Sequence, residues 1–268
     1  MAGDITMFTE VDQTSDPDFF VRFLDRGNAL PSIVQSKPII LDGLRLSPGK
    51  RVLDLGCGMG TDVFDIAQRV GSTGSVTGVD VSEVMIAQAR QRAEGLNLPV
   101  SFEVADAQAL RFEDASFDAC RSERMLMHVP DPGSALSEMV RVTKPSGRIS
   151  VFDFDWDTFV IDGPDRATTR AVVAAFSDGL RNGQVGRALP RLFRENGMRD
   201  VHVVGHTVFI DFEFLGLLIG GALTAAQAVG TLDPGDVSAW WKGLAEADER
   251  GDFLAGITAF IVSGSIGD

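Results

Sequence analysis

Three alternating glycines directly after a short apolar segment form the clearest chemical pattern in the sequence. Residues 52–55 read Val-Leu-Asp-Leu, and Gly56, Gly58 and Gly60 follow, with a helical pattern after them. Because glycine has no side chain, such a turn can approach a ligand closely, while the helix N-terminus offers free N–H groups. Asp80 ends the next apolar segment, where its carboxylate can accept both hydroxyls of a ribose. The pattern predicts a site for a nucleotide-like cofactor.

The charge beside this turn distinguishes between cofactors. A dinucleotide fingerprint needs glycine at position 61, where this chain has Thr61. Asp54 lies two residues before the turn, and its carboxylate would repel a pyrophosphate but attract the ammonium and sulfonium groups of S-adenosylmethionine. The residues therefore favour S-adenosylmethionine. A nicotinamide-dependent dehydrogenase is the alternative for the turn.

Short apolar runs alternate with amphipathic stretches from residue 51 onward, and these elements must position the turn. Such alternation indicates a parallel sheet with helices on both faces, which is the doubly wound α/β class. The predicted strands are 51–55, 75–79, 100–104, 117–120 and 148–152, and the clearest helical patterns are 83–95 and 134–143.

Two regions fall outside this alternation. Residues 1–47 are expected to form a helical arm or lid, and residues 155–195 a helical cap. Residues 211–251 are interpreted as an insertion between two late strands, and the cofactor-binding domain is expected to span 48–268. The arm helices are expected near 18–25 and 32–44, and the late strands at 201–204, 207–210 and 253–262.

The residues from Leu46 to Phe154 resemble class I S-adenosylmethionine-dependent methyltransferases, most closely the small-molecule enzymes of the ubiquinone/menaquinone-biosynthesis type. The resemblance implies a Rossmann-like, mostly parallel sheet of seven strands, the last of them reversed. Besides the glycine turn, the segments that carry it are Gly78-Val79-Asp80-Val81-Ser82, Ala105-Asp106-Ala107, Phe117-Asp118, His128-Val129-Pro130-Asp131-Pro132 and Arg141-Val142-Thr143-Lys144-Pro145.

The resemblance also implies which residues bind the cofactor. The glycines would bind its methionine end, Asp80 the ribose, and Asp106 with Ala107 the adenine. Val81 and Met85 would pack against the adenine, while the backbone near Ser122 would approach the methionine part. The expected cofactor-binding residues are thus Asp54, Gly56, Cys57, Gly58, Asp80, Val81, Met85, Asp106, Ala107 and Ser122.

His128 is the first candidate for a catalytic residue. It follows the predicted strand 117–120, at the edge where ligands of open α/β sheets bind. An ordinary histidine pKa of about 6.5 suits removal of a proton from a phenol or alcohol during methyl transfer. Alternatively, the ring ties the turn at 130–132 to a backbone carbonyl. Tyrosine, another common base, is absent from the chain.

Asp153 is the second candidate, within a run in which three aspartates alternate with two aromatic residues. The period of two places the carboxylates on one face of a strand and the rings on the other. An acidic wall beside a ring-binding wall is one interpretation, and solvated acids at a strand end are the alternative. Asp153 is expected to face the site. The run is Asp153, Phe154, Asp155, Trp156 and Asp157.

Metal ligation is not expected. Cys57 and Cys120 lack a metal-ligand spacing, and no third ligand accompanies His202 and His206. Aromatic residues of the arm and the insertion could line an apolar pocket, form ordinary core or make a homodimer contact. They are Phe8, Phe19, Phe20, Phe23, Phe212, Phe214, Trp240 and Trp241.

Overall composition restricts the partners. The 268 residues include 24 Lys and Arg against 38 Asp and Glu, a formal charge of −14, so phosphate-rich nucleic acids and anionic membranes are poor partners. Two cysteines without disulfide spacing, and no apolar run of the roughly 20 residues that span a membrane, lead us to expect a cytoplasmic protein.

The sequence therefore predicts a methyltransferase that uses S-adenosylmethionine and releases S-adenosylhomocysteine. The acceptor is expected to be a small, largely apolar molecule of secondary metabolism or quinone-like biosynthesis, methylated on O, N or C. Most of the acceleration would come from proximity, orientation and exclusion of water. The alternative is a repurposed, non-catalytic relative that keeps the cofactor as a structural ligand.

Overall fold

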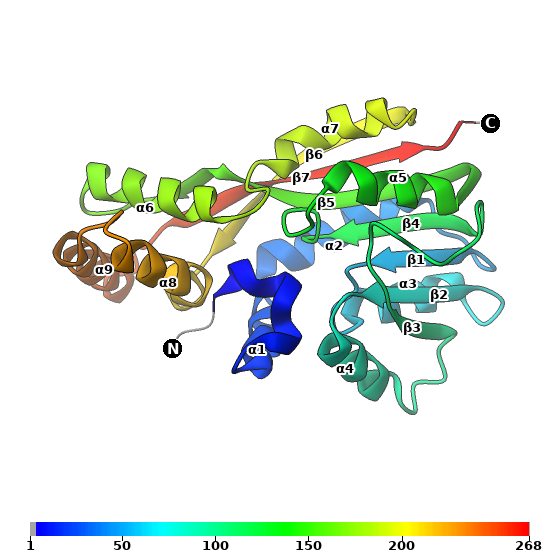
Figure 1. The fold of residues 1–268 in the computed structure, drawn as a ribbon, viewed down its shortest axis with the longest axis horizontal. Helices are drawn as coiled ribbons and strands as arrows, with labels where there is room; N and C mark the ends of the chain where they lie inside the picture. The colour runs from blue at the N-terminus through cyan, green and yellow to red at the C-terminus, as the bar shows by residue number, and fades with distance from the viewer. Residues whose placement is uncertain (1–3, 268) are drawn as a thin grey trace.

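A seven-stranded sheet runs through the computed structural model, which describes residues 4–267 (Figure 1). The strand order is β3-β2-β1-β4-β5-β7-β6; β7 is antiparallel to both of its neighbours, and the other pairings are parallel. The expected α/β class, with a reversed last strand, is confirmed. The strands are β1 (Arg51–Leu55), β2 (Ser75–Asp80), β3 (Val100–Val104), β4 (Phe117–Glu123), β5 (Thr143–Ile161), β6 (Arg199–Ile210) and β7 (Ala255–Ser265).

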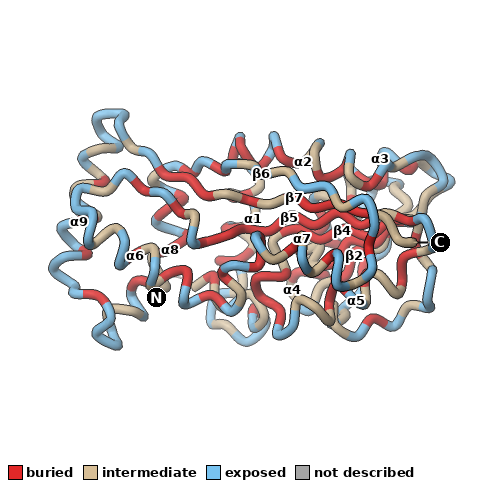
Figure 2. The backbone as a smooth tube through the Cα atoms, turned by 90° about the horizontal axis from the view of Figure 1, so that it is seen from above, coloured by how far each residue is buried: buried red, intermediate tan, exposed pale blue. Residues whose placement is uncertain are grey.

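Helices cover both faces of the parallel half of the sheet, so its central strands β1 and β4 are largely buried (Figure 2). Val52 and Val76 pack against α2, α3 and α4 on one face. Leu53 and Leu55 point to the other face, where their apolar cluster also contains residues of α5 and α7. These helices are α2 (Pro31–Leu44), α3 (Thr61–Val70), α4 (Glu83–Ala93), α5 (Pro132–Val142) and α7 (Val185–Glu195).

Strands β5, β6 and β7 extend beyond the parallel half and carry a helical lobe (Figure 1). The lobe consists of α6 (Arg166–Gly179), α8 (Phe212–Ala228) and α9 (Pro234–Glu249), which contact one another. Residues 211–251, interpreted from the sequence as an insertion between two late strands, contain α8 and α9. The two strands expected at 201–204 and 207–210 are one continuous strand, since Gly205 pairs with Phe260 without a break.

The expected cap is wrong over its first residues, because β5 continues to Ile161. Three aspartates in five residues suggested a solvated strand end. Instead Asp155 is buried and ion-paired with Arg187 of α7, so the strand carries a carboxylate in its interior without an unpaired charge.

The N-terminal arm packs across the end of the sheet. It contains a 3-10 helix, η1 (Ile5–Gln13), and α1 (Pro17–Asn28), followed by α2. Asp4 and Asp16 accept backbone N–H bonds at the starts of η1 and α1, which fixes where each helix begins. Residues 1–3 of the expected arm lie outside the described residues. Over 4–267, the helices are all too short or too polar to cross a bilayer.

Candidate active site

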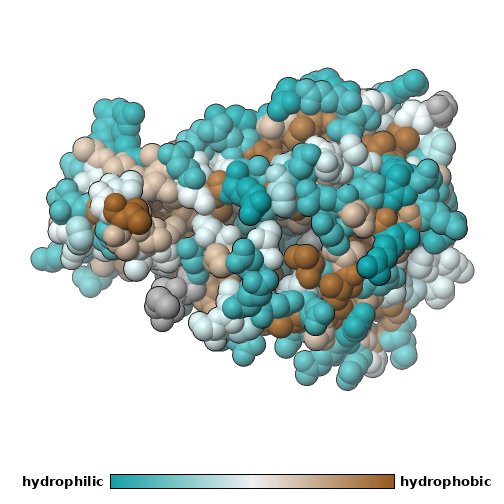
Figure 3. Space-filling model, viewed as in Figure 1, coloured by the Kyte–Doolittle hydropathy of each residue, from teal (hydrophilic) through white to brown (hydrophobic). Residues whose placement is uncertain are grey.

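A cavity of about 410 Å³ lies between the carboxyl ends of β1, β2 and β4, the arm, and the lobe. One end is lined by the glycine turn and Asp80, and the other by aromatic and aliphatic side chains. On the face seen in Figure 3, apolar surface gathers between α1 and α4. The cavity thus joins a polar compartment to an apolar one.

The glycine turn has a backbone geometry that glycine adopts without strain. Gly56, Gly58 and Gly60 have φ values of 68°, 51° and 78°, in the left-handed region that favours glycine. A Cβ on Gly56 would lie 2.5 Å from Cγ of Met125, and one on Gly60 2.8 Å from the Phe102 ring. Neither position can carry a side chain without displacing its neighbour.

Asp80 is held in place beside this turn. Its Oδ2 accepts the Gly58 N–H at 2.9 Å, and its Oδ1 accepts the Ser82 N–H at 3.0 Å. Burial raises the pKa of Asp80. Each carboxylate oxygen keeps a second lone pair, so a ribose diol next to Gly58 could be bound without moving either backbone bond.

The arm closes over this corner of the cavity. Asp12 of η1 accepts bonds from the Ser82 hydroxyl at 2.5 Å and from the Glu83 and Val84 N–H groups at 2.7 and 3.3 Å. The N-terminus of α4 is thus capped by a residue of the arm, immediately after Asp80. Asp25 of α1 adds a bidentate ion pair with Arg92 at 2.9 Å.

Eight of the ten residues expected to bind the cofactor line the cavity, and Asp54 and Ser122 do not. Both are buried behind the wall, and within residues 4–267 the Ser122 hydroxyl has no hydrogen-bond partner. A backbone contact of Ser122 with the cofactor stays a prediction. The eight are Gly56, Cys57, Gly58, Asp80, Val81, Met85, Asp106 and Ala107.

The electrostatic argument from Asp54 is corrected by the structure. Its carboxylate accepts bonds from Arg121 at 2.9 and 3.1 Å and is 1% exposed. Burial raises the pKa of Asp54 to about 6, although Arg121 opposes this shift. The charge of Asp54 is therefore balanced within the protein and is not free to attract a cationic cofactor.

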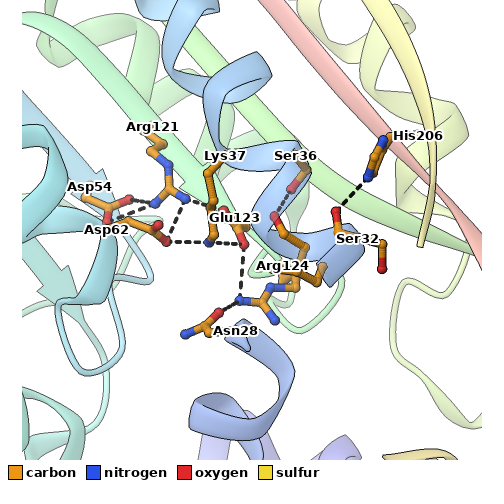
Figure 4. A network of polar contacts seen from close by, with 11 residues as sticks. Asn28, Ser32, Ser36, Lys37, Asp54, Asp62, Arg121, Glu123, Arg124 and His206 are labelled. Carbon is orange, nitrogen blue, oxygen red and sulfur yellow. Dashed lines mark hydrogen bonds and ion pairs between the residues drawn. The ribbon is translucent and has the colours of Figure 1, made fainter. Parts of the chain in front are cut away.

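Arg121 is the centre of a buried network that the sequence did not predict (Figure 4). Besides Asp54, its guanidinium contacts Asp62 of α3 at 2.8 Å and Glu123 on its own strand. Lys37 of α2 bridges the same two carboxylates at 2.8 and 2.6 Å. Burial opposes ionisation of Asp62, but Arg121 and Lys37 hold its pKa well below the usual range.

Two contacts of Arg124 extend the network toward the arm. Arg124 pairs with Glu123 at 3.1 Å and donates a hydrogen bond to the side-chain oxygen of Asn28. The run Arg121-Ser122-Glu123-Arg124 at the end of an apolar strand was the available clue. No sequence pattern indicated the role of Lys37, because its partners are distant in sequence.

His128 lines the cavity and lies against the arm. The centroid of its ring is 5.1 Å from that of Phe8, and burial lowers its pKa to about 4. Its backbone N–H bonds to the Met125 carbonyl, but among the described residues the imidazole has no hydrogen-bond partner. The ring is thus neutral at neutral pH and faces the cavity rather than tying the 130–132 turn.

Asp153 does not line the cavity, which corrects the expectation that it faces the site. The alternation is as predicted, but Phe154 and Trp156 are the residues that point into the cavity. The Asp153 carboxylate accepts the N–H groups of Met127 and Phe154 at 3.3 and 3.0 Å, and burial raises its pKa to about 7. Its contacts position the loop that carries His128.

The aromatic residues of the arm and insertion divide into two groups. Phe8, Phe23 and Phe214 line the cavity. Trp240 and Trp241 instead pack in the lobe, 5.0 Å apart by ring centroids, and Trp240 donates a hydrogen bond to Thr169. Ordinary packing therefore accounts for the tryptophan pair. The two strand histidines do not converge on a ligand either, because His206 bonds to the Ser32 carbonyl at 2.7 Å.

Comparison with known proteins places this geometry in a family. The model of the methyltransferase domain family matches residues 46–197, which covers the glycine turn, Asp80 and the His128 loop. The chain belongs to this family. The expected class I S-adenosylmethionine-dependent methyltransferase is thereby confirmed as the enzyme class.

Similar proteins align with different shares of this methyltransferase. A 37.1 kDa protein of transposon Tn4556 from Streptomyces fradiae, described as uncharacterized, is 38% identical over 247 residues, 90% of this chain and 70% of its own. The ubiquinone/menaquinone biosynthesis C-methyltransferase UbiE of Bdellovibrio bacteriovorus is 40% identical over 106 residues, 40% of this chain and 45% of its own. The chain thus spans less than half of that named enzyme.

Solved structures share the fold. Phosphoethanolamine N-methyltransferase 2 of Haemonchus contortus, crystallised in complex with S-adenosyl-L-methionine, superposes with a TM-score of 0.63 at 17% identity. The match covers 99% of this chain and 60% of that one. At this identity the likeness shows the fold alone.

Proposed function

We propose that this methyltransferase transfers a methyl group from S-adenosylmethionine to a small, largely apolar acceptor. The observation that carries the proposal is the single cavity that joins the glycine turn and Asp80 to an aromatic compartment. When bound, S-adenosylmethionine supplies an electrophilic methyl group on a sulfonium. The polar end suits its ribose and methionine parts, and the apolar end suits a ring-bearing acceptor.

The residues at the polar end would bind and orient the cofactor. Asp80 would accept the ribose hydroxyls, and Gly58 would let them approach the backbone. Met85 and Val81 would pack against the adenine, with Asp106 and the adjacent Ala107 at its edge. The open backbone of Gly56, at the first turn before α3, would bind the methionine end.

The residues at the apolar end would exclude water and align the acceptor. Phe8 and Phe23 come from the arm, Phe154 and Trp156 from β5, and Phe214 from α8. Holding two reactants in line can supply about 7–11 kcal/mol of the barrier, which is enough to make chemical assistance secondary. We propose on this basis that the arm serves as the lid of the site.

His128 and Asp153 have supporting roles in this proposal. The neutral His128 ring could accept a hydrogen bond from an acceptor hydroxyl. Its depressed pKa makes it a weak base, because a base transfers protons best when its pKa lies near the working pH. Asp153, with Asn182 bonded to the Leu126 and Val129 carbonyls, would hold the loop in place.

The setting of the reaction is also proposed. A charge of −14 supports a protein that does not bind nucleic acid, and two free cysteines, Cys57 and Cys120, support a reducing, cytoplasmic compartment. The apolar acceptor compartment supports a substrate from secondary metabolism or quinone-like biosynthesis. A homodimer through the lobe would be detected as a doubled mass in sedimentation.

A radiolabelled methyl-transfer assay tests the function. The protein is incubated with methyl-labelled S-adenosylmethionine and a panel of phenols, hydroxyquinones, enols and amines that carry apolar rings. We expect label in at least one product and none when Asp80→Ala replaces the natural protein. Tight cofactor binding without transfer to any member of the panel would support the repurposed, non-catalytic alternative.

A further inference from the structure

Arg124 lies where the charged network meets the apolar compartment. Its backbone has φ 55°, an uncommon value for a residue with a side chain, and its N–H bonds to the Phe152 carbonyl. A Cβ built on Gly27 would lie 3.5 Å from Nη1 of Arg124 and 3.2 Å from Cζ of Phe214. The guanidinium thus lies beside Phe214, and both Arg124 and Phe214 line the cavity.

The hydrogen bonds of this guanidinium are incomplete. Nη2 contacts the Asn28 side-chain oxygen and Glu123. Nε is buried without a partner, and within residues 4–267 no hydrogen bond is made by Nη1. An arginine has five N–H donors, and buried donors without acceptors are costly. Arg124 therefore has donors left for a ligand.

The charge of Arg124 is also the least balanced in the network. Arg121 contacts three carboxylates, and Lys37 contacts two. Arg124 contacts only Glu123, which Arg121 and Lys37 share. One carboxylate common to three cations leaves the outermost of them available to a further anion.

The surroundings of Arg124 define what that anion is attached to. The rings of Phe23 and Phe214 stack with centroids 5.1 Å apart, and Leu30, Ile33 and Ile210 line the same compartment. These side chains offer no hydrogen bonds to a polar ligand body. A ligand that reaches Arg124 through them is apolar except at one end.

We propose that Arg124 binds an anionic oxygen of the methyl acceptor, so that the acceptors of this enzyme are apolar, ring-bearing acids. This inference rests on the proposed function. An ionised phenol, enol or carboxylic acid would enter with its charge paired, whereas an amine cation would meet a like charge. Transfer of a charge into an apolar site is unfavourable without such a partner.

An acceptor that arrives ionised also suits the chemistry. Its oxygen lone pair forms the bond to the methyl carbon as the carbon–sulfur bond breaks, and that electron pair returns to sulfur. The acid and the sulfonium become a neutral methyl ether or ester and a neutral thioether. No proton has to be removed, so a weakly basic His128 is sufficient.

Calorimetric titration with 2-naphthoate and its neutral isostere 2-naphthamide, in the presence of S-adenosylhomocysteine, tests the proposal. We expect the natural protein to bind naphthoate more tightly than naphthamide. Arg124→Met should lower the affinity for naphthoate by about 10- to 100-fold and the affinity for naphthamide by less than about twofold. Arg124→Lys, which keeps the charge, should retain part of the preference. Arg181→Met is the matched control, because Arg181 also lines the cavity but is exposed.

Three results would overturn the proposal. The natural protein could bind both probes equally, or Arg124→Met and Arg124→Lys could weaken both probes by the same factor. Alternatively, Arg124→Met could lower the affinity for S-adenosylhomocysteine but not for 5′-methylthioadenosine, which lacks the amino-acid part. The anion bound by Arg124 would then be the carboxylate of the cofactor. Failure of the natural protein to bind S-adenosylhomocysteine would instead contradict the proposed function itself.

Discussion

The two ends of the cavity are built in different ways. The polar end, which we propose binds the cofactor and which is termed the cofactor end, comes from short contiguous segments of the sheet: the turn after β1, the end of β2 and the residues after β3. The apolar end, which we propose binds the acceptor and which is termed the acceptor end, is assembled from the arm, the far parts of β5, β6 and β7, and α8. One end is thus fixed by local backbone geometry, and the other depends on tertiary packing. Mutations should separate the two.

The buried network between the two ends should give the largest effect on stability. Arg121→Met leaves Asp54, Asp62 and Glu123 without their shared partner, and breaking a buried ion pair in this way costs about 3–5 kcal/mol. Urea unfolding measures this loss. Arg187→Met is the control; it also uncovers a buried carboxylate, but Arg187 is half exposed, so the loss should be smaller. Equal losses would contradict the central position of Arg121.

Asp80→Ala should give the largest effect on the cofactor end. It removes the carboxylate that would accept hydrogen bonds from the two ribose hydroxyls. Loss of these hydrogen bonds to a charged group should lower the affinity for S-adenosylhomocysteine by about 100-fold. Binding of 2-naphthamide should change by less. Asp65→Ala removes an exposed carboxylate from α3 as the control. An unchanged cofactor affinity in Asp80→Ala would show that the ribose lies elsewhere.

Phe8→Ala should affect only the acceptor end. The ring contacts Phe20 and His128, and its loss opens the cavity toward solvent. We expect catalytic efficiency toward an apolar acceptor to fall by about tenfold or more, with the affinity for S-adenosylhomocysteine unchanged. Phe19→Ala, which removes a ring of the arm that does not line the cavity, is the matched control. A parallel loss of cofactor affinity would mean that the two ends are not separable.

The smallest expected effects are on the pH dependence of stability, and they have opposite signs. Burial raises the folded pKa of Asp153 to about 7, so the folded state binds more protons than the unfolded state from about pH 4 to 7, and stability falls as pH rises. Burial lowers the folded pKa of His128 to about 4, so stability rises with pH up to about 6.5.

Removing each group should therefore tilt the profile in its own direction. Asp153→Asn should make the free energy of unfolding rise more steeply with pH, and His128→Gln should make it rise less steeply. Each change is at most the about 1.4 kcal/mol per pH unit that one proton gives. Urea unfolding between pH 5 and 8, in the ranges set by these pKa values, measures both slopes. Changes of the same sign would contradict the environments described for the two residues.

The sequence was sufficient to place eight of the ten expected residues at the cofactor end of the cavity, because the determinants of the turn and of Asp80 are local. Positive φ values at Gly56, Gly58 and Gly60 require glycine, and the register of parallel β1 and β2 brings Asp80 to the same edge. The alternation of strand and helix likewise determined the class of fold. Both features produce patterns that can be recognised in a single amino-acid sequence.

The remaining features depend on pairs that are distant in sequence. Lys37, Asp62 and Glu123 meet only after α2 packs on β4 and α3 packs on β1 and β2, so no spacing in the chain predicts their contact. The same is true of Arg187, which neutralises Asp155 and lets β5 continue. The period of two correctly separated Asp153 from Phe154, but only the packed structure shows which face meets the cavity.

Calorimetric titration of the purified protein with S-adenosylhomocysteine, S-adenosylmethionine and NAD tests the central claim most directly. We predict one site per chain for the first two ligands, no binding of NAD, and loss of that site in Asp80→Ala but not in Phe8→Ala. Binding of NAD in preference to the other two, or equal affinities of both variants for S-adenosylhomocysteine, would contradict a cofactor end built from the glycine turn and Asp80.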